Sequence, residues 1–254
     1  MEHATPPTTA AFVIIDDSNW RSLPVNLSDL SRQRDVTPHI VVLDQTDSGV
    51  GRVEGATVVR LGPGVSSGES LHAGLDATAA RLVALCVPGV RSLPARFGRQ
   101  HAELTLNPHI DAVTSNLVLV DEQGCLVAEA NPYKAAEAPT PFWQAGTMFR
   151  RSALATVGRS PDFPEDLRLY LQLRARGRTS HLDQVLSVAS KVDFDEAIEG
   201  SLRDALAVRK ISPPIQPPSH RRPAARPHRT AGLVQERSAS DALDRMIREG
   251  AFDR

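Results

Sequence analysis

The chain has 254 residues, 41% of them hydrophobic and 23% charged, with a formal net charge of −1. A chain of this size and composition can bury one large core, so we expect one main domain in a soluble protein. No apolar stretch approaches the roughly 18 residues of a membrane-spanning helix, and the first residues lack the plan of a signal peptide. The two cysteines, Cys86 and Cys125, lie in or beside apolar runs, which predicts buried reduced thiols and a cytoplasmic location.

Short apolar runs alternate with helix-like segments through the first part of the chain. Leucines at helical spacing (Leu23, Leu27 and Leu30) follow the first run, and a segment rich in alanine and leucine, 70–81, precedes the fourth. This alternation predicts an α/β fold with a mixed, mostly parallel sheet flanked by helices. The expected strands are 11–15, 39–43, 56–61, 82–87 and 112–120.

The next part of the chain reads as a helix, a hairpin and two more helices. A helix at 94–106 opens at a proline, and the turn at 121–124 joins the fifth expected strand to a sixth, CLVAE. Further helices are expected at 149–157 and 165–176, the second ending at Gly177. A last strand is expected at 182–188.

The composition changes after Ile211, where prolines and arginines replace apolar residues. Such a segment cannot bury enough apolar surface to fold and predicts a linker. We therefore divide the chain into a disordered start (1–10), a main domain (11–211), a basic proline-rich linker (212–236) and an amphipathic helix (237–254). The helix is expected to dock on a partner protein or on its own domain, and the linker could bind an anionic membrane surface or nucleic acid.

The order of these landmarks resembles that of family 2 nucleotide-sugar glycosyltransferases, which have the GT-A fold. The strand VII with Asn19 after it resembles the opening strand and its Tyr-Asn turn, and HIVVLDQTDSG resembles the second strand and its acidic loop. HAGL, which begins at His72, stands where the family has an Asn-x-Gly helix start. AGTMFRRSALATVG and PEDLRLYLQLRARGR resemble the acceptor-side helix and the Glu-Asp helix. The resemblance covers about 11–188 and implies transfer of a sugar from a nucleotide-sugar donor to an unknown acceptor.

Polar residues follow the first two expected strands. The carboxyl ends of parallel strands meet at one edge, where open α/β sheets bind ligands, and an aspartate there can accept a hydrogen bond from a base or a ribose. The other interpretation is that these side chains only cap helices and form turns. The predicted donor-binding residues are Asp16, Asp17, Asn19, Asp44, Asp47, His72 and Arg91.

A second acidic group, Glu165 with Asp166, stands at the start of an expected helix, where carboxylates are ordinary because they suit the helix dipole. The resemblance implies a further role, in which Asp166 is the general base that deprotonates the acceptor hydroxyl and Glu165 is its neighbour. These two residues are the predicted catalytic pair.

The metal-binding motif of the family is missing. Family members place Asp-x-Asp after the fourth strand to hold a divalent cation, but this chain has Val87, Pro88, Gly89 and Val90 there. The histidine that often completes that site also lacks a counterpart at 187–190, so no metal cofactor is expected. Two alternatives remain: a cation among Arg81, Arg91 and Arg96 replaces the metal, or the fold serves as a catalytically silent binding or assembly subunit.

Overall fold

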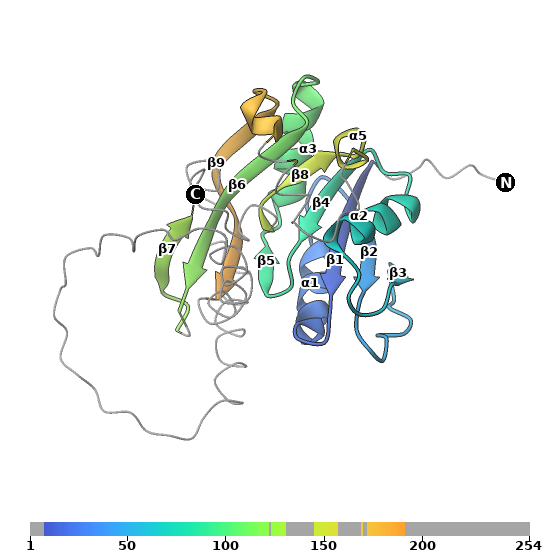
Figure 1. The fold of residues 1–254 in the computed structure, drawn as a ribbon. Coiled ribbons are helices and arrows are strands. Elements are labelled where there is room, and N and C mark those ends of the chain that lie inside the picture. Colours follow the sequence, from blue (N-terminus) through green and yellow to red (C-terminus); the bar gives the residue numbers. More distant parts are fainter. Residues whose placement is uncertain (1–7, 122, 131–144, 157–168, 170–171, 191–254) are drawn as a thin grey trace, which may run out of the picture.

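A computed structural model describes residues 8–121, 123–130, 145–156, 169 and 172–190. The predicted catalytic pair, Glu165 and Asp166, and the predicted linker and terminal helix lie outside the described residues. The sheet has nine strands, and eight of them follow the order β3-β2-β1-β4-β8-β6-β9-β5 while β7 pairs with β6 (Figure 1).

One half of the sheet is parallel. It consists of β1 (Thr9–Ile15), β2 (His39–Asp44), β3 (Ala56–Arg60) and β4 (Leu82–Cys86), with β1 between β2 and β4. These are four of the strands that the apolar runs predict.

The other half of the sheet is mixed. The short β8 (Met148–Arg150) is antiparallel to both β4 and β6 (Ala112–Val120), and β9 (Thr179–Ser190) runs parallel to β6. The sheet is completed by two antiparallel strands, β5 (Val90–Ser92) on β9 and β7 (Leu126–Ala130) on β6. The predicted mixed and mostly parallel α/β fold is therefore confirmed.

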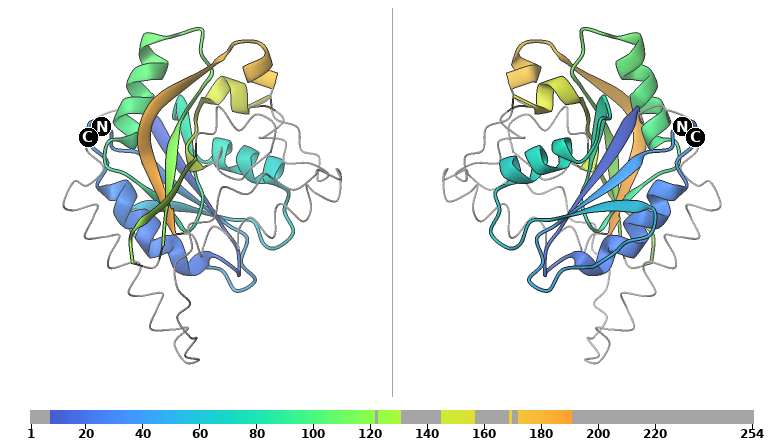
Figure 2. Two further views of the ribbon diagram at one scale, coloured as in Figure 1. Left: turned by 90° about the vertical axis from the view of Figure 1, so that its left-hand side faces the viewer. Right: turned by 90° about the vertical axis from the view of Figure 1, so that its right-hand side faces the viewer.

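Helices cover both faces of the sheet (Figure 2). On one face, α1 (Leu23–Ser31) and α3 (Arg96–Leu106) enclose a core that includes Val13 and Ile15 of β1. On the other face, α2 (Ser67–Asp76) and the short α5 (Arg151–Leu154) pack on a core around Phe12. This division follows from the alternation of side chains along β1. No helix among the described residues is long and apolar enough to cross a membrane.

Local sequence explains how α2 begins and how closely it packs. Ser66 and Glu69 form a capping box, in which each side chain accepts a hydrogen bond from the other residue's backbone N–H. Inside the helix, a Cβ built on Gly74 would stand 2.6 Å from the ring of Phe12. Glycine at this position therefore lets α2 approach β1 to within aromatic contact.

Some sequence expectations differ from the structure. The helix predicted at 149–157 is wrong, because Met148–Arg150 is a strand that pairs with β4 and β6, and the helix after it spans only Arg151–Leu154. Sheet pairing here overrides the local helical pattern. The thiols remain free, but Cys125 is exposed rather than buried, while Cys86 is buried as expected.

Candidate functional site

The order in which the parallel strands are added to the sheet reverses at β1. The chain moves from β1 to β2 and β3 on one side, and then crosses to β4 on the other side. In the sheet Ile15 pairs with Asp44 and Val13 pairs with Cys86, so all three strands end at the same edge. In open α/β sheets, ligands bind outside the carboxyl ends of the strands at such a switch point. The candidate site is this edge, with the β1 and β2 loops on one side and the β4 loop on the other.

The β1 loop is a tight turn made by its own polar side chains. Asp16 accepts hydrogen bonds from the backbone N–H of Ser18 at 2.8 Å and of Asn19 at 3.2 Å. Asn19 in turn accepts from the backbone N–H of Asp16 at 3.0 Å. These two predicted site residues therefore lie together and shape the turn, in agreement with the turn-forming alternative for their role.

Asp44 at the end of β2 is buried, with 1% of its surface exposed. It accepts hydrogen bonds from the backbone and hydroxyl of Thr46 and from the backbone of Val50, and Arg60 lies 3.1 Å from its carboxylate. Burial alone would raise its pKa, but these hydrogen bonds and the Arg60 charge outweigh burial and hold the pKa below its usual value. Asp44 thus stabilises the β2 loop.

The two loops contact each other through exposed acidic residues. The backbone N–H of Asp47 donates to both carboxylate oxygens of Asp17, at 3.3 and 3.2 Å. Asp17 and Asp47 are exposed, so their carboxylates reach solvent at the edge of the sheet. The structure therefore brings together Asp16, Asp17, Asn19, Asp44 and Asp47, as the strand pattern predicts.

Sequence reasoning missed Trp20, which follows this turn in a short 3-10 helix, Trp20–Ser22. Its surface is 45% exposed, although aromatic residues make up only 4% of the chain. Arg21 lies over its ring, 6.0 Å from the centroid. The sequence does contain a signal for this residue, which is a tryptophan in a polar turn directly after a buried strand. An exposed aromatic side chain beside acidic loops is suited to stacking on a base.

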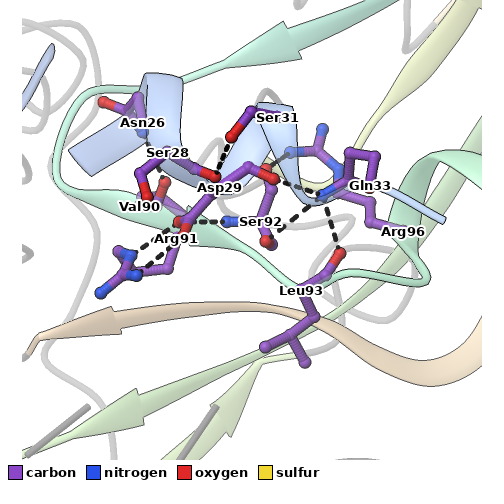
Figure 3. A network of polar contacts seen from close by, with 10 residues as sticks. All are labelled: Asn26, Ser28, Asp29, Ser31, Gln33, Val90, Arg91, Ser92, Leu93 and Arg96. Carbon is purple, nitrogen blue, oxygen red and sulfur yellow. Dashed lines mark hydrogen bonds and ion pairs between the residues drawn. The ribbon is translucent and has the colours of Figure 1, made fainter. Parts of the chain in front are cut away.

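On the other side of the switch point, the segment after β4 is clamped by α1 (Figure 3). Asp29 of α1 receives two hydrogen bonds from Arg91, at 2.6 and 2.7 Å, and both residues are buried. Asn26 of α1 donates to the backbone carbonyl of Val90 at 3.0 Å. Arg91 was predicted to bind the donor, but at least two of its donors are committed to Asp29 inside the protein.

The clamp continues past the end of α1 through Gln33 (Figure 3). Its amide nitrogen donates to the carbonyl of Leu93 at 3.0 Å, and its amide oxygen accepts from the backbone N–H of Phe97 at 3.0 Å. One side chain therefore joins the segment after β4 to the first turn of α3. These hydrogen bonds hold the segment after β4 against α1 and α3.

Arg96, at the start of α3, is buried, with 1% of its surface exposed. It donates to the carbonyl of Leu85 in β4 at 2.8 Å and to the hydroxyl of Ser92 at 2.9 Å. Longer contacts reach Gln100 at 3.4 Å and the carbonyl of Thr147 at 3.5 Å. Every one of these acceptors is neutral.

The segment before β8 runs beside the end of β4 and is also held by buried side chains. Gln100 donates to the carbonyl of Gly146 at 2.6 Å, and Ser187 donates to the carbonyl of Ala145 at 3.1 Å. The carbonyl of Thr147 accepts from the backbone N–H of Leu85 at 3.2 Å, which places this segment at the same sheet edge. Two fixed segments, 87–93 and 145–147, therefore flank the β4 side of the site.

The remaining predicted residue, His72, is half-buried in α2. Within the described parts of the chain, no three His, Cys, Asp or Glu side chains gather as they would around a metal ion. The side chains of Val87, Pro88 and Gly89 carry no atom that could bind one.

No protein-family model matches this chain, and no curated protein matches it by sequence. The fold is similar to that of a solved structure, glucosyl-3-phosphoglycerate synthase from Mycobacterium tuberculosis in complex with phosphoglyceric acid. The TM-score is 0.51 at 15% sequence identity, and the match covers 79% of each chain. This similarity shows that the chain has a fold like that of GT-A glycosyltransferases.

Proposed function

We propose that this chain binds a nucleotide-sugar at the carboxyl ends of β1, β2 and β4 and transfers the sugar to an acceptor without a divalent metal ion. The observation that carries the proposal is the grouping of two acidic loops and the exposed Trp20 at the switch point of a GT-A-like sheet. Carboxylates accept hydrogen bonds from ribose hydroxyls and base N–H groups, and an aromatic face stacks on a base. The nucleoside is therefore assigned to the β1 and β2 loops.

The residues do not fit the divalent cation that this fold class uses. The three residues after β4 carry no side-chain ligand, and across the switch point the carboxylates of Asp16, Asp17 and Asp44 accept hydrogen bonds from the backbone of the β1 and β2 loops. The proposed reaction therefore includes no metal step. Asp166, with Glu165 beside it, remains the proposed general base, on the strength of the sequence resemblance.

Binding can be tested by titrating the purified protein with UDP-glucose and dTDP-glucose by calorimetry, in EDTA and in Mn²⁺. Trp20→Ala should weaken binding by about tenfold, because stacking on an aromatic side chain contributes about 1–3 kcal/mol per base. Trp20→Phe should retain most of the affinity. Leu106→Ala is the matched control, since Leu106 is also an exposed large apolar residue, 77% exposed, at the end of α3. If no nucleotide-sugar binds in either condition, or if Trp20→Ala binds as tightly as the unchanged protein, the proposal is wrong.

A second candidate is a catalytically silent subunit that keeps the fold for binding or assembly. The specific observation in its favour is the absence of metal ligands at Val87, Pro88 and Gly89. The two candidates differ in turnover: a silent subunit would bind nucleotide-sugar in the titration but would release no nucleoside diphosphate with any acceptor.

A further inference from the structure

Three buried charged side chains, Asp29, Arg91 and Arg96, lie close to the segment after β4, and they sum to one excess positive charge. Arg91 is neutralised by Asp29, because their two hydrogen bonds form a buried ion pair. Arg96 forms no ion pair with any carboxylate among the described residues. It donates hydrogen bonds to two carbonyls, a hydroxyl and an amide, and the thiol of Cys86 is a further hydrogen-bond partner. Burial lowers the pKa of Arg96, yet arginine stays protonated in proteins.

The thiol of Cys86 contacts Arg96 and would neutralise it if it were ionised, but it is not ionised. Burial raises the pKa of Cys86, and the hydrogen bond and charge of Arg96 only partly oppose this effect. Cys86 is therefore a neutral thiol at physiological pH. A buried charge without a counter-ion is costly, and this cost falls when an anion is close by.

The position of Arg96 indicates where that anion binds. Its guanidinium contacts the carbonyl of Leu85, one residue before the end of β4, and reaches toward Thr147 in the other segment that flanks this side of the edge. No acidic side chain stands in 87–93 or 145–147 to repel an anion. On the β1 side, by contrast, Asp17 and Asp47 are exposed and disfavour phosphate.

We propose that the β4 side of the switch point is a diphosphate subsite and that buried Arg96 supplies the fixed positive charge that a divalent cation supplies elsewhere in this fold class. The inference rests on the proposed function, because it assigns the diphosphate of the same donor. The nucleoside lies over the acidic β1 and β2 loops, and the diphosphate lies over the segments 87–89 and 145–147. Arg96 acts through space from below the backbone and is a positioning residue rather than a catalytic one.

Inorganic pyrophosphate is the probe, because it carries the charge without a base or a sugar. In EDTA it should bind the unchanged protein, Arg96→Lys should retain most of the affinity, and Arg96→Met should lose about tenfold or more, equal to about 1.4 kcal/mol. Arg150→Met is the matched control, since Arg150 also binds the backbone carbonyls of Leu104, Ile110 and Asn107, away from the β4 loop. Arg150→Met should lower the free energy of unfolding and leave the pyrophosphate affinity unchanged.

A second pair of variants keeps Arg96 in place, so that the test does not depend on the folding of Arg96→Met. Pro88→Asp adds a carboxylate to the segment 87–89, over which the diphosphate is proposed to lie, and should weaken pyrophosphate binding by about tenfold, whereas Pro88→Asn should not. Equal affinity of the Asp and Asn variants, or of Arg96→Met and the unchanged protein, would overturn the inference. So would pyrophosphate binding that requires Mn²⁺. If nucleotide-sugar binds but Arg96 has no effect, the proposed function stands and this inference fails. If pyrophosphate binding depends on Arg96 but no nucleotide-sugar binds, Arg96 supports an anion site and the proposed function fails.

Discussion

Arg91 and Asp29 form a two-pronged ion pair in the interior, with Nε to Oδ2 at 2.6 Å and Nη2 to Oδ1 at 2.7 Å. The pair joins α1 to β5 and so holds the segment that follows β4. Removal of one partner leaves the other charge buried, so Asp29→Ala should lower the free energy of unfolding by about 3–5 kcal/mol. Urea denaturation measures the change. The double variant Asp29→Leu/Arg91→Met should lose less than the sum of the two single variants, and additive losses would show that the pair is not coupled.

Asp44 should make the free energy of unfolding depend on pH in the acid range. Its pKa is lowered from a usual value of 3.8, so its carboxylate stabilises the folded state above that pH and loses this contribution as the pH falls through the lowered pKa. Asp44→Asn should therefore be less stable than the unchanged protein at pH 7, and the difference should shrink progressively below about pH 4. Thermal unfolding between pH 2 and 7 tests this, and a constant difference would contradict it.

Gly74→Ala should destabilise the protein even though alanine favours helix. The new Cβ would meet the Phe12 ring at 2.6 Å, and overpacking of this kind costs about 1–3 kcal/mol. Combining it with Phe12→Leu should recover part of the loss, because the smaller side chain leaves room for the methyl group. A more stable Gly74→Ala protein would show that α2 can move away from β1 without cost.

Asp166→Asn should lower turnover by about two or more orders of magnitude if Asp166 is the general base. Nucleotide-sugar affinity should change little, because the base acts on the acceptor. The measurement is release of nucleoside diphosphate in the presence of an acceptor. An active enzyme whose Asp166→Asn variant keeps full turnover would remove this assignment.

Divalent cations should have little effect on nucleotide binding. Because Val87, Pro88 and Gly89 cannot hold a cation through their side chains, Mn²⁺ should change the dissociation constant of UDP-glucose by less than tenfold, or about 1.4 kcal/mol. A larger gain would reveal a metal site formed by other residues of the chain.

The sequence predicted the long elements well and the short ones poorly. Apolar runs such as 39–43 and 112–120 correspond to β2 and β6, because burial on both faces gives a strand a continuous hydrophobic signal. The strands β5 and β8 are three residues long each, and they exist only because distant strands pair with them. The local sequence contains no pattern that predicts a strand this short.

The site shows a similar division. Grouping of Asp16, Asp17 and Asp47 follows from the general geometry of parallel strands. The clamp was not foreseen, because Asn26, Asp29 and Gln33 recur at helical spacing as a polar stripe, which ordinarily indicates a face exposed to solvent. Only the tertiary arrangement shows that this stripe binds the backbone of 90–97.

The clamp also implies an order of assembly during synthesis. Among the residues that the structure describes, those whose hydrogen bonds fix the β1 and β2 loops, and those that join α1 to the segment 90–97, precede position 98 in the chain. The acceptors that Arg96 and Gln100 find near β8 come about fifty residues later, at Gly146 and Thr147. During synthesis the residues of the acidic side leave the ribosome before β8 exists, and the contacts of Arg96 and Gln100 with 146–147 can form only after that later part of the chain has been made.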